Sequence, residues 1–197
     1  NGTIERNLVI CEWNHAGGSR IGISLGGGGS GPPKICEDRD CTIEHTNGII
    51  RNNIVLNCAR DVGVYLNKAK NTKVYNNTLI NTGGIDVRFQ GSTADIRNNI
   101  VSGLVRNRDG GDHTEANNLV HRHSGTLMGL YADVTKGNFR LKREGEIMGQ
   151  GRRLPEVTDD FCGRPRHLAV YDLGAIEYGP GRCGTAEMLR DAVNFGK

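Results

Sequence analysis

Apolar and polar residues alternate with a period of two in several short segments, which is the pattern of β-strands that bury one face. Three such segments are Ile21-Gly22-Ile23-Ser24-Leu25, Gly63-Val64-Tyr65-Leu66-Asn67 and Gly84-Ile85-Asp86-Val87-Arg88. A second phrase, centred on paired asparagines, recurs between them. Its copies are Arg51-Asn52-Asn53-Ile54-Val55, Tyr75-Asn76-Asn77-Thr78-Leu79, Arg97-Asn98-Asn99-Ile100-Val101 and Ala116-Asn117-Asn118-Leu119-Val120, with a degenerate copy at Glu5-Arg6-Asn7-Leu8-Val9. Each repeat is therefore expected to contain three short strands and three turns.

The spacing of the asparagine phrase predicts the architecture. Its second asparagine falls at Asn7, Asn53, Asn77, Asn99 and Asn118, at intervals of 46, 24, 22 and 19 residues. About 22 residues per turn with three strands predicts an all-β, right-handed parallel β-helix of about five coils over residues 1–120, with the asparagines stacked in a ladder. The first interval contains about 24 extra residues, which we assign to a long loop at 26–41. The alternative is a β-sandwich, which predicts alternation but no fixed phrase at a fixed period.

The period is lost from residue 121. Residues 133–141 look irregular, a short helical turn is expected over Arg143–Met148, and a terminal helix is expected over Thr185–Val193 with Thr185 as N-cap. Open strand edges promote aggregation, so we assign residues 121–197 to an irregular C-terminal segment that covers the last coil.

Composition agrees with a chain that turns often. Glycine accounts for 29 and asparagine for 19 of the 197 residues, and both accept left-handed turns. The net charge of +3 is too small to indicate nucleic-acid binding. No apolar run approaches the roughly 18 residues of a membrane span, so we expect no membrane partner.

Six cysteines without a Cys-x-x-Cys pair favour disulfides over zinc and indicate a secreted or periplasmic protein. Cys11 and Cys58 follow their ladder asparagines by 4 and 5 residues, which places them in adjacent coils about 5 Å apart. We expect Cys36–Cys41 to close the long loop and Cys162–Cys183 to fix the tail, one of the 15 possible pairings. The chain opens Asn1-Gly2 without Met, as in a processed product.

Several segments resemble bacterial secreted right-handed β-helix repeat proteins. They are Asp61-Val62-Gly63-Val64-Tyr65-Leu66-Asn67, Asn76-Asn77-Thr78-Leu79, Gly84-Ile85-Asp86-Val87-Arg88-Phe89, Arg106-Asn107-Arg108-Asp109-Gly110-Gly111, Asp160-Phe161-Cys162-Gly163-Arg164-Pro165-Arg166 and Asp172-Leu173-Gly174-Ala175-Ile176-Glu177. Proteins with this fold include pectate, alginate and chondroitin lyases, epimerases, glycoside hydrolases and phage tailspikes. The resemblance implies the fold and not one reaction, and it implies further coils before Asn1.

One face of the predicted solenoid gathers the candidate site. If Ile23, Val64 and Ile85 point inward, two outer rows combine Tyr65, Asn67, Asp86, Arg88, Arg106 and Arg108, with Asp109 and Asp112 on the adjoining loop. Lyases of similar fold use an arginine or lysine as proton acceptor and a Ca²⁺ held by acidic residues or asparagine. The resemblance therefore implies catalytic roles for Arg88, Arg106, Arg108 and Asp86, and substrate-binding roles for Tyr65, Asn67 and Asp109. The alternative is that these charges form ordinary surface ion pairs between coils.

Two further groups have a chemical and a structural interpretation. His121 and His123, with Asp112 and His113 nearby, could bind a transition metal or could be polar surface residues. Lys68 could act as a base or could be a solvated turn residue.

The sequence predicts an exported protein that acts on an anionic polysaccharide, as a lyase with a possible Ca²⁺ cofactor. The alternative is a noncatalytic β-helix that binds a glycan or another surface molecule. The strand residues Thr3-Ile4-Glu5 leave an open edge, through which we expect self-association or pairing with further coils.

Overall fold

The computed structural model describes residues 1–11, 21–27, 43–142, 146–166 and 169–187, and it is a parallel β-solenoid. The first sheet contains β1 (Gly2–Glu5), β5 (Gly48–Arg51), β9 (Thr72–Tyr75), β12 (Thr93–Arg97) and β15 (Asp112–Ala116). The second contains β2 (Leu8–Ile10), β6 (Ile54–Leu56), β10 (Thr78–Ile80), β13 (Ile100–Ser102) and β16 (Leu119–His121). The third contains β3 (Ile23–Gly26), β7 (Val64–Asn67), β11 (Gly84–Arg88) and β14 (Leu104–Arg108).

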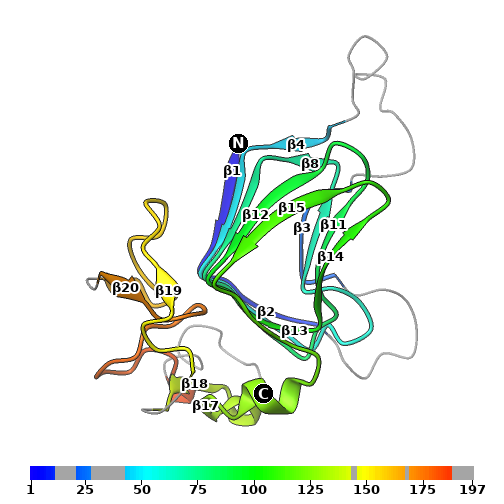
Figure 1. The fold of residues 1–197 in the computed structure, drawn as a ribbon. Helices are drawn as coiled ribbons and strands as arrows, with labels where there is room; N and C mark the ends of the chain where they lie inside the picture. Colours follow the sequence, from blue (N-terminus) through cyan, green and yellow to red (C-terminus); the bar gives the residue numbers. More distant parts are fainter. Residues whose placement is uncertain (12–20, 28–42, 143–145, 167–168, 188–197) are drawn as a thin grey trace.

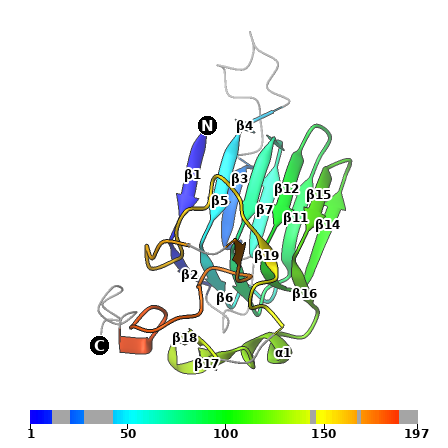
Figure 2. The same ribbon diagram turned by 60° about the vertical axis from the view of Figure 1, so that its left-hand side comes forward.

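The predicted parallel β-helix is confirmed, with four complete three-sided turns and a fifth turn that has two strands. Figure 1 looks along the solenoid, and Figure 2 shows the strands stacked from β1 to β15. Between Asn7 and Asn53, the longest interval of the repeat, the structure adds the short strand β4 (His45–Thr46), which pairs with β8 (Ala69–Lys70) of the next turn. Gly26 still belongs to β3, and the rest of the predicted loop lies mostly outside the described residues.

The asparagine ladder holds the turns in register, as predicted. Each ladder amide donates to the amide oxygen of the next turn at 3.0 Å, from Asn7 through Asn53, Asn77 and Asn99 to Asn118. The asparagine before each of the last four ladder residues has a φ between 51° and 58°, in the left-handed region that asparagine tolerates. The paired asparagines therefore make the corner and align the coils together.

Apolar side chains from all three sheets fill the interior. Fully buried examples are Ile50, Val55, Val64, Leu79 and Ile96. The predicted Cys11–Cys58 disulfide joins adjacent turns with a Cα–Cα distance of 5.0 Å, and the predicted Cys162–Cys183 disulfide is present as well. Cys36 and Cys41 lie outside the described residues.

The C-terminal segment packs along the side of the solenoid, against the outer face of the second sheet. It contains α1 (Ser124–Met128), β17 (Tyr131–Asp133), the 3₁₀ helix η2 (Val134–Lys136), β18 (Asn138–Leu141), β19 (Gly151–Arg152) and β20 (Val170–Tyr171). Ile54, Ile80 and Ile100 form one apolar cluster with Leu127, Phe139 and Ile176. We expected this segment to cover the last turn of the solenoid. The strands of that turn remain partly exposed, and the segment covers the side formed by the second sheet.

Two local expectations need correction. Residues 133–141, expected to be irregular, contain η2 and β18. Strand β18 pairs antiparallel with β17, and Phe139 packs edge to face on Tyr131. Within the described part of Arg143–Met148, residues 146–148 form a turn without helix. Most of the terminal helix expected at Thr185–Val193 falls on residues that the structure does not describe.

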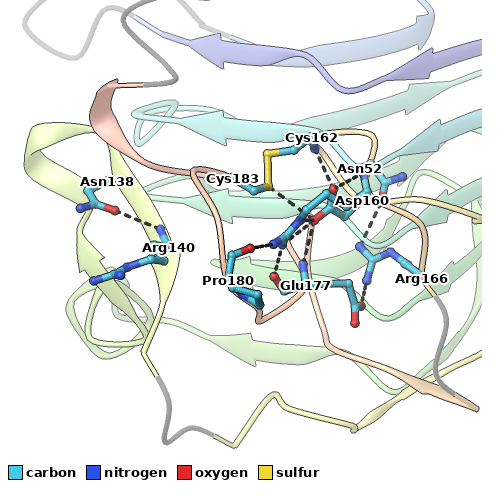
Figure 3. Close-up of a disulfide and its surroundings, with 10 residues drawn as sticks. Asn52, Asn138, Arg140, Asp160, Cys162, Arg166, Glu177, Pro180 and Cys183 are labelled. Atoms are coloured by element: carbon cyan, nitrogen blue, oxygen red, sulfur yellow. Dashed lines mark hydrogen bonds and ion pairs between the residues drawn. A yellow bond between two sulfur atoms is a disulfide. The ribbon is translucent and has the colours of Figure 1, made fainter.

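Buried charges anchor this segment to the solenoid (Figure 3). Asp160 is fully buried, and its Oδ2 lies 2.8 Å from Nη2 of Arg164. The guanidinium of Arg166 pairs with Glu177 and donates to Asn52 Oδ1 at 3.1 Å. The segment Asp160–Arg166 therefore has a structural role, because Arg166 links the C-terminal segment to Asn52 at a corner of the solenoid.

Candidate functional site

The outer face of the third sheet brings the predicted site residues together in two rows. Tyr65, Asp86 and Arg106 are register partners on β7, β11 and β14. Asn67, Arg88 and Arg108 are partners two residues further along the same strands. Because strand residues alternate between faces, each inward apolar residue places one polar neighbour on this surface. The geometry predicted from the alternation is confirmed, whereas the roles of these residues remain predictions.

Asp86 is the centre of the network. It is 0% exposed, and its two carboxylate oxygens accept from different arginines. Arg106 Nε donates to Oδ1 at 2.8 Å, and Arg108 Nη1 donates to Oδ2 at 2.6 Å. Both arginine side chains are 41% exposed. Two guanidinium groups therefore share one carboxylate, which leaves an excess positive charge at the surface.

Arg88 is held by a separate set of partners on the same face. Its Nε donates to Asp109, and its Nη1 donates to the Tyr65 hydroxyl at 3.0 Å. The Asn67 amide donates to the same hydroxyl at 3.4 Å. The guanidinium lies 4.5 Å above the centroid of the Phe89 ring, within the range of a cation–π contact. Arg88 is thus fixed in place before any ligand binds.

The two charged rows keep arginine in its protonated form. The hydrogen bond to Asp109 is the largest cause that raises the pKa of Arg88, followed by the bond to Tyr65. The hydrogen bond to Asp86 likewise raises the pKa of Arg108. These contacts hold both guanidinium groups in the charged form, which is the form that binds anions.

Phe89 belongs to this surface and was missed in the sequence analysis. Its φ is 70°, an uncommon conformation for a bulky residue, and its ring is partly exposed. Lys68 and Asp109 occupy the same corner in the neighbouring turns, with φ of 51° and 49°. An aromatic residue directly after the third strand of a repeat is the signal that could have identified it. Lys68 itself pairs with Glu44 at 3.6 Å, as a surface residue does.

The residues around the arginines do not fit a Ca²⁺ ion. Ca²⁺ takes six to eight oxygen ligands. Both oxygens of Asp86 already accept from arginine, and Asp109 is paired with Arg88. Across the described ranges, the one cluster of three potential metal ligands is Asp160, Cys162 and Cys183. Its two cysteines are joined in a disulfide, so we derive no step through a metal.

The histidines do not form a metal site among the described residues either. His121 ends β16 and His123 precedes α1, so they do not share one strand face as expected. Their ring centroids lie 6.3 Å apart. His113 Nδ1 bonds to Asn107 Oδ1, across the turn that joins β14 to β15.

Comparison with protein-family models, curated proteins and solved structures finds no match to this chain. The parallel β-solenoid of the resemblance is present, and no family identifies it. In the described residues, no helix is long and apolar enough to cross a membrane. The two disulfides indicate an oxidising, extracytoplasmic location.

Proposed function

We propose that this protein is an exported β-solenoid that binds an anionic polysaccharide on the outer face of its third sheet. The observation that carries the proposal is the pair Arg106 and Arg108, which share the single buried carboxylate of Asp86. Among the described residues, Arg108 donates through Nη1 alone, so its other N–H groups are available to a ligand. Guanidinium groups bind carboxylate and sulfate in planar, charge-assisted geometry.

The arrangement of the rows suits an extended ligand. Successive turns of a parallel sheet lie about 4.8 Å apart, so a chain along the solenoid axis meets equivalent positions at each turn. Tyr65 and Phe89 add aromatic surface beside the arginines. The disulfides suit a secreted or periplasmic protein, which would meet such polymers outside the cytoplasm.

Binding without turnover is the version that the geometry supports best. A lyase of the expected kind needs a neutral base and a screened substrate carboxylate. Arg88 and Arg108 are protonated and paired with carboxylates, and both oxygens of Asp86 accept from arginine. In this arrangement these residues meet neither requirement. The lyase activity therefore stays a prediction.

Calorimetric titration with heparin, alginate and polygalacturonate at low salt tests the proposal. We expect Arg108→Ala to weaken binding by about 10- to 100-fold, the equivalent of one charge-assisted hydrogen bond of ~1.5–3 kcal/mol. Arg97→Ala is the matched control, because Arg97 is 38% exposed and pairs with Asp95 at 2.7 Å on the first sheet. Its affinity should equal that of the wild type.

Three outcomes would contradict the proposal. The first is the absence of binding to all three polymers, and the second is an equal loss of affinity in both variants. The third is the release of an ultraviolet-absorbing unsaturated product during incubation, which would show that the protein is a lyase and not a noncatalytic binding protein.

A further inference from the structure

A cavity of about 440 Å³ lies between the second sheet and the C-terminal segment, on a different side of the solenoid from the arginines. Figure 1 shows α1 beneath this sheet. Leu56 and Ile80 line the cavity from the sheet, and Met128 of α1 and Val134 of η2 line it from the other side. The lining residues, all within the described ranges, include no charged side chain. A cavity of this size with mostly apolar walls is typical of small-molecule sites, and the lack of charge favours an uncharged ligand.

Two asparagines supply much of the polar part of the lining. Asn57 follows β6 and Asn81 follows β10 in the next turn, with left-handed φ values of 61° and 56°. The Asn81 amide donates to Asn57 Oδ1 at 3.0 Å, so the two form a short ladder of their own. In the preceding turn, the register places Cys11, which is in a disulfide, beside Asn57. In the following turn, it places Gly103, which has no side chain, beside Asn81. The short ladder therefore ends at these two asparagines.

The short ladder leaves hydrogen-bonding groups without protein partners at the cavity. In the part of the chain that the structure describes, Asn81 Oδ1 accepts from no donor and Asn57 Nδ2 donates to no acceptor. The Ser124 hydroxyl, also in the lining, has no hydrogen-bond partner in those ranges either. In the asparagine ladder, by contrast, an oxygen such as Asn99 Oδ1 accepts the side-chain amide of a neighbouring turn. An N–H group from a ligand would give Asn81 Oδ1 the partner that the following turn does not supply.

We propose that this cavity binds the acetamido group of an N-acetylhexosamine residue, as a second carbohydrate site that does not depend on the arginines of the third sheet. The acetamido N–H donates to Asn81 Oδ1, and the methyl group packs against Ile80 and Met128. The amide of Asn57 and the hydroxyl of Ser124 bind oxygens of the sugar. An acetamido group suits this lining better than a hydroxyl does, because it brings an N–H donor and an apolar methyl to one place and carries no charge.

Titration of the isotope-labelled protein with chitotriose and cellotriose, followed by NMR, tests the proposal. Each sugar ring carries an acetamido group in the first ligand and a hydroxyl at the same carbon in the second. We expect chitotriose to bind at least about 10-fold more tightly, from one hydrogen bond and one buried methyl, and to shift the side-chain amide signals of Asn57 and Asn81. Asn81→Gly should weaken chitotriose binding by about 3- to 10-fold, since glycine tolerates the left-handed corner but lacks the oxygen. Asn117→Gly is the matched control, because Asn117 has a φ of 55°, is exposed and lies outside the cavity lining. Its affinity should equal that of the wild type.

Two further variants make the result specific. Ser124→Trp should abolish chitotriose binding by filling the cavity while both asparagines stay in place, which covers the case in which Asn81→Gly does not fold. Arg108→Ala should leave the affinity for chitotriose unchanged, because Arg108 lies on the third sheet. Absence of chitotriose binding, equal binding of cellotriose, or an equal loss in Asn81→Gly and Asn117→Gly would overturn the inference. A loss of chitotriose affinity in Arg108→Ala would overturn it as well. So would binding of N-acetylalanine methylamide as tight as that of chitotriose, which would indicate a site for peptides.

Discussion

The asparagine ladder should contribute most to stability at its centre, and Asn77→Ala tests this. The Asn77 amide donates to Ile50 O at 2.9 Å, to Tyr75 O at 3.1 Å and to Asn99 Oδ1 at 3.0 Å. Its oxygen accepts from the backbone N–H and the side-chain amide of Asn53, both at 3.0 Å. Asn77 is fully buried, so water cannot replace these partners.

The magnitude follows from which partners are left unpaired. Asn99 Oδ1 keeps the Asn77 N–H, and Tyr75 O keeps the Asn52 N–H. The Asn53 N–H loses its acceptor, at about 1–3 kcal/mol for a buried unpaired donor. The Asn77 amide has two protons for its three acceptors, so together with the bond from the Asn53 amide it accounts for about three further bonds. At roughly 0.5–1 kcal/mol each, they bring the expected loss to about 2.5–6 kcal/mol.

Asn7→Ala is the matched control at the end of the same ladder. Asn7 is exposed, and Asn53 Oδ1 keeps the Asn7 backbone N–H after the change. We therefore expect a loss below about 1 kcal/mol. The assay is equilibrium urea unfolding followed by far-ultraviolet circular dichroism, with the disulfides intact.

Asn77→Asp separates hydrogen bonding from packing, because it preserves size. A carboxylate can still accept from Asn53 but cannot donate to the three oxygens that Asn77 now serves. It should destabilise the protein at least as much as Asn77→Ala at neutral pH. Equal losses for Asn77→Ala and Asn7→Ala, or a near-wild-type Asn77→Asp, would refute this account of the ladder.

Two more predictions concern the disulfides and the C-terminal segment. Replacing both cysteines of Cys11–Cys58 with serine should lower the free energy of unfolding by about 4 kcal/mol, against about 3 kcal/mol for Cys162–Cys183. The first disulfide closes a loop of 47 residues and the second a loop of 21. Urea unfolding measures both losses, and the reverse order would contradict the loop-length argument. The hydrogen bond from Lys73 is the main cause that lowers the pKa of Glu156 below its usual 4.5, so the stability from this pair is present at neutral pH and lost as the pH falls below 4.5. The pair is partly exposed and worth less than about 1 kcal/mol, and the difference in unfolding free energy between wild type and Glu156→Gln should shrink from pH 6 to pH 3. A difference that grows over this range would show that the sign is wrong.

The sequence by itself determined the features that depend on local backbone preference and on periodicity. Paired asparagines mark a left-handed corner followed by a stacked amide, so their spacing defines the turn length. Alternation in segments such as 64–67 assigns each residue to the interior or the surface. Register between neighbouring turns then follows from the repeat, which is why the two rows of the site and the Cys11–Cys58 pairing could be predicted.

Only the tertiary structure decided how the surface groups are paired and what covers the side of the solenoid. Arg88 and Arg108 are neighbours, yet one pairs with Asp109 and the other with Asp86, because a long side chain reaches several carboxylates and packing selects among them. The apolar run Ile54-Val55-Leu56 lacks alternation because both of its faces are buried. The run itself does not indicate which segment of the chain covers its outer face. That segment has no period of its own, so its place along the second sheet follows from long-range contacts such as Arg166 with Asn52.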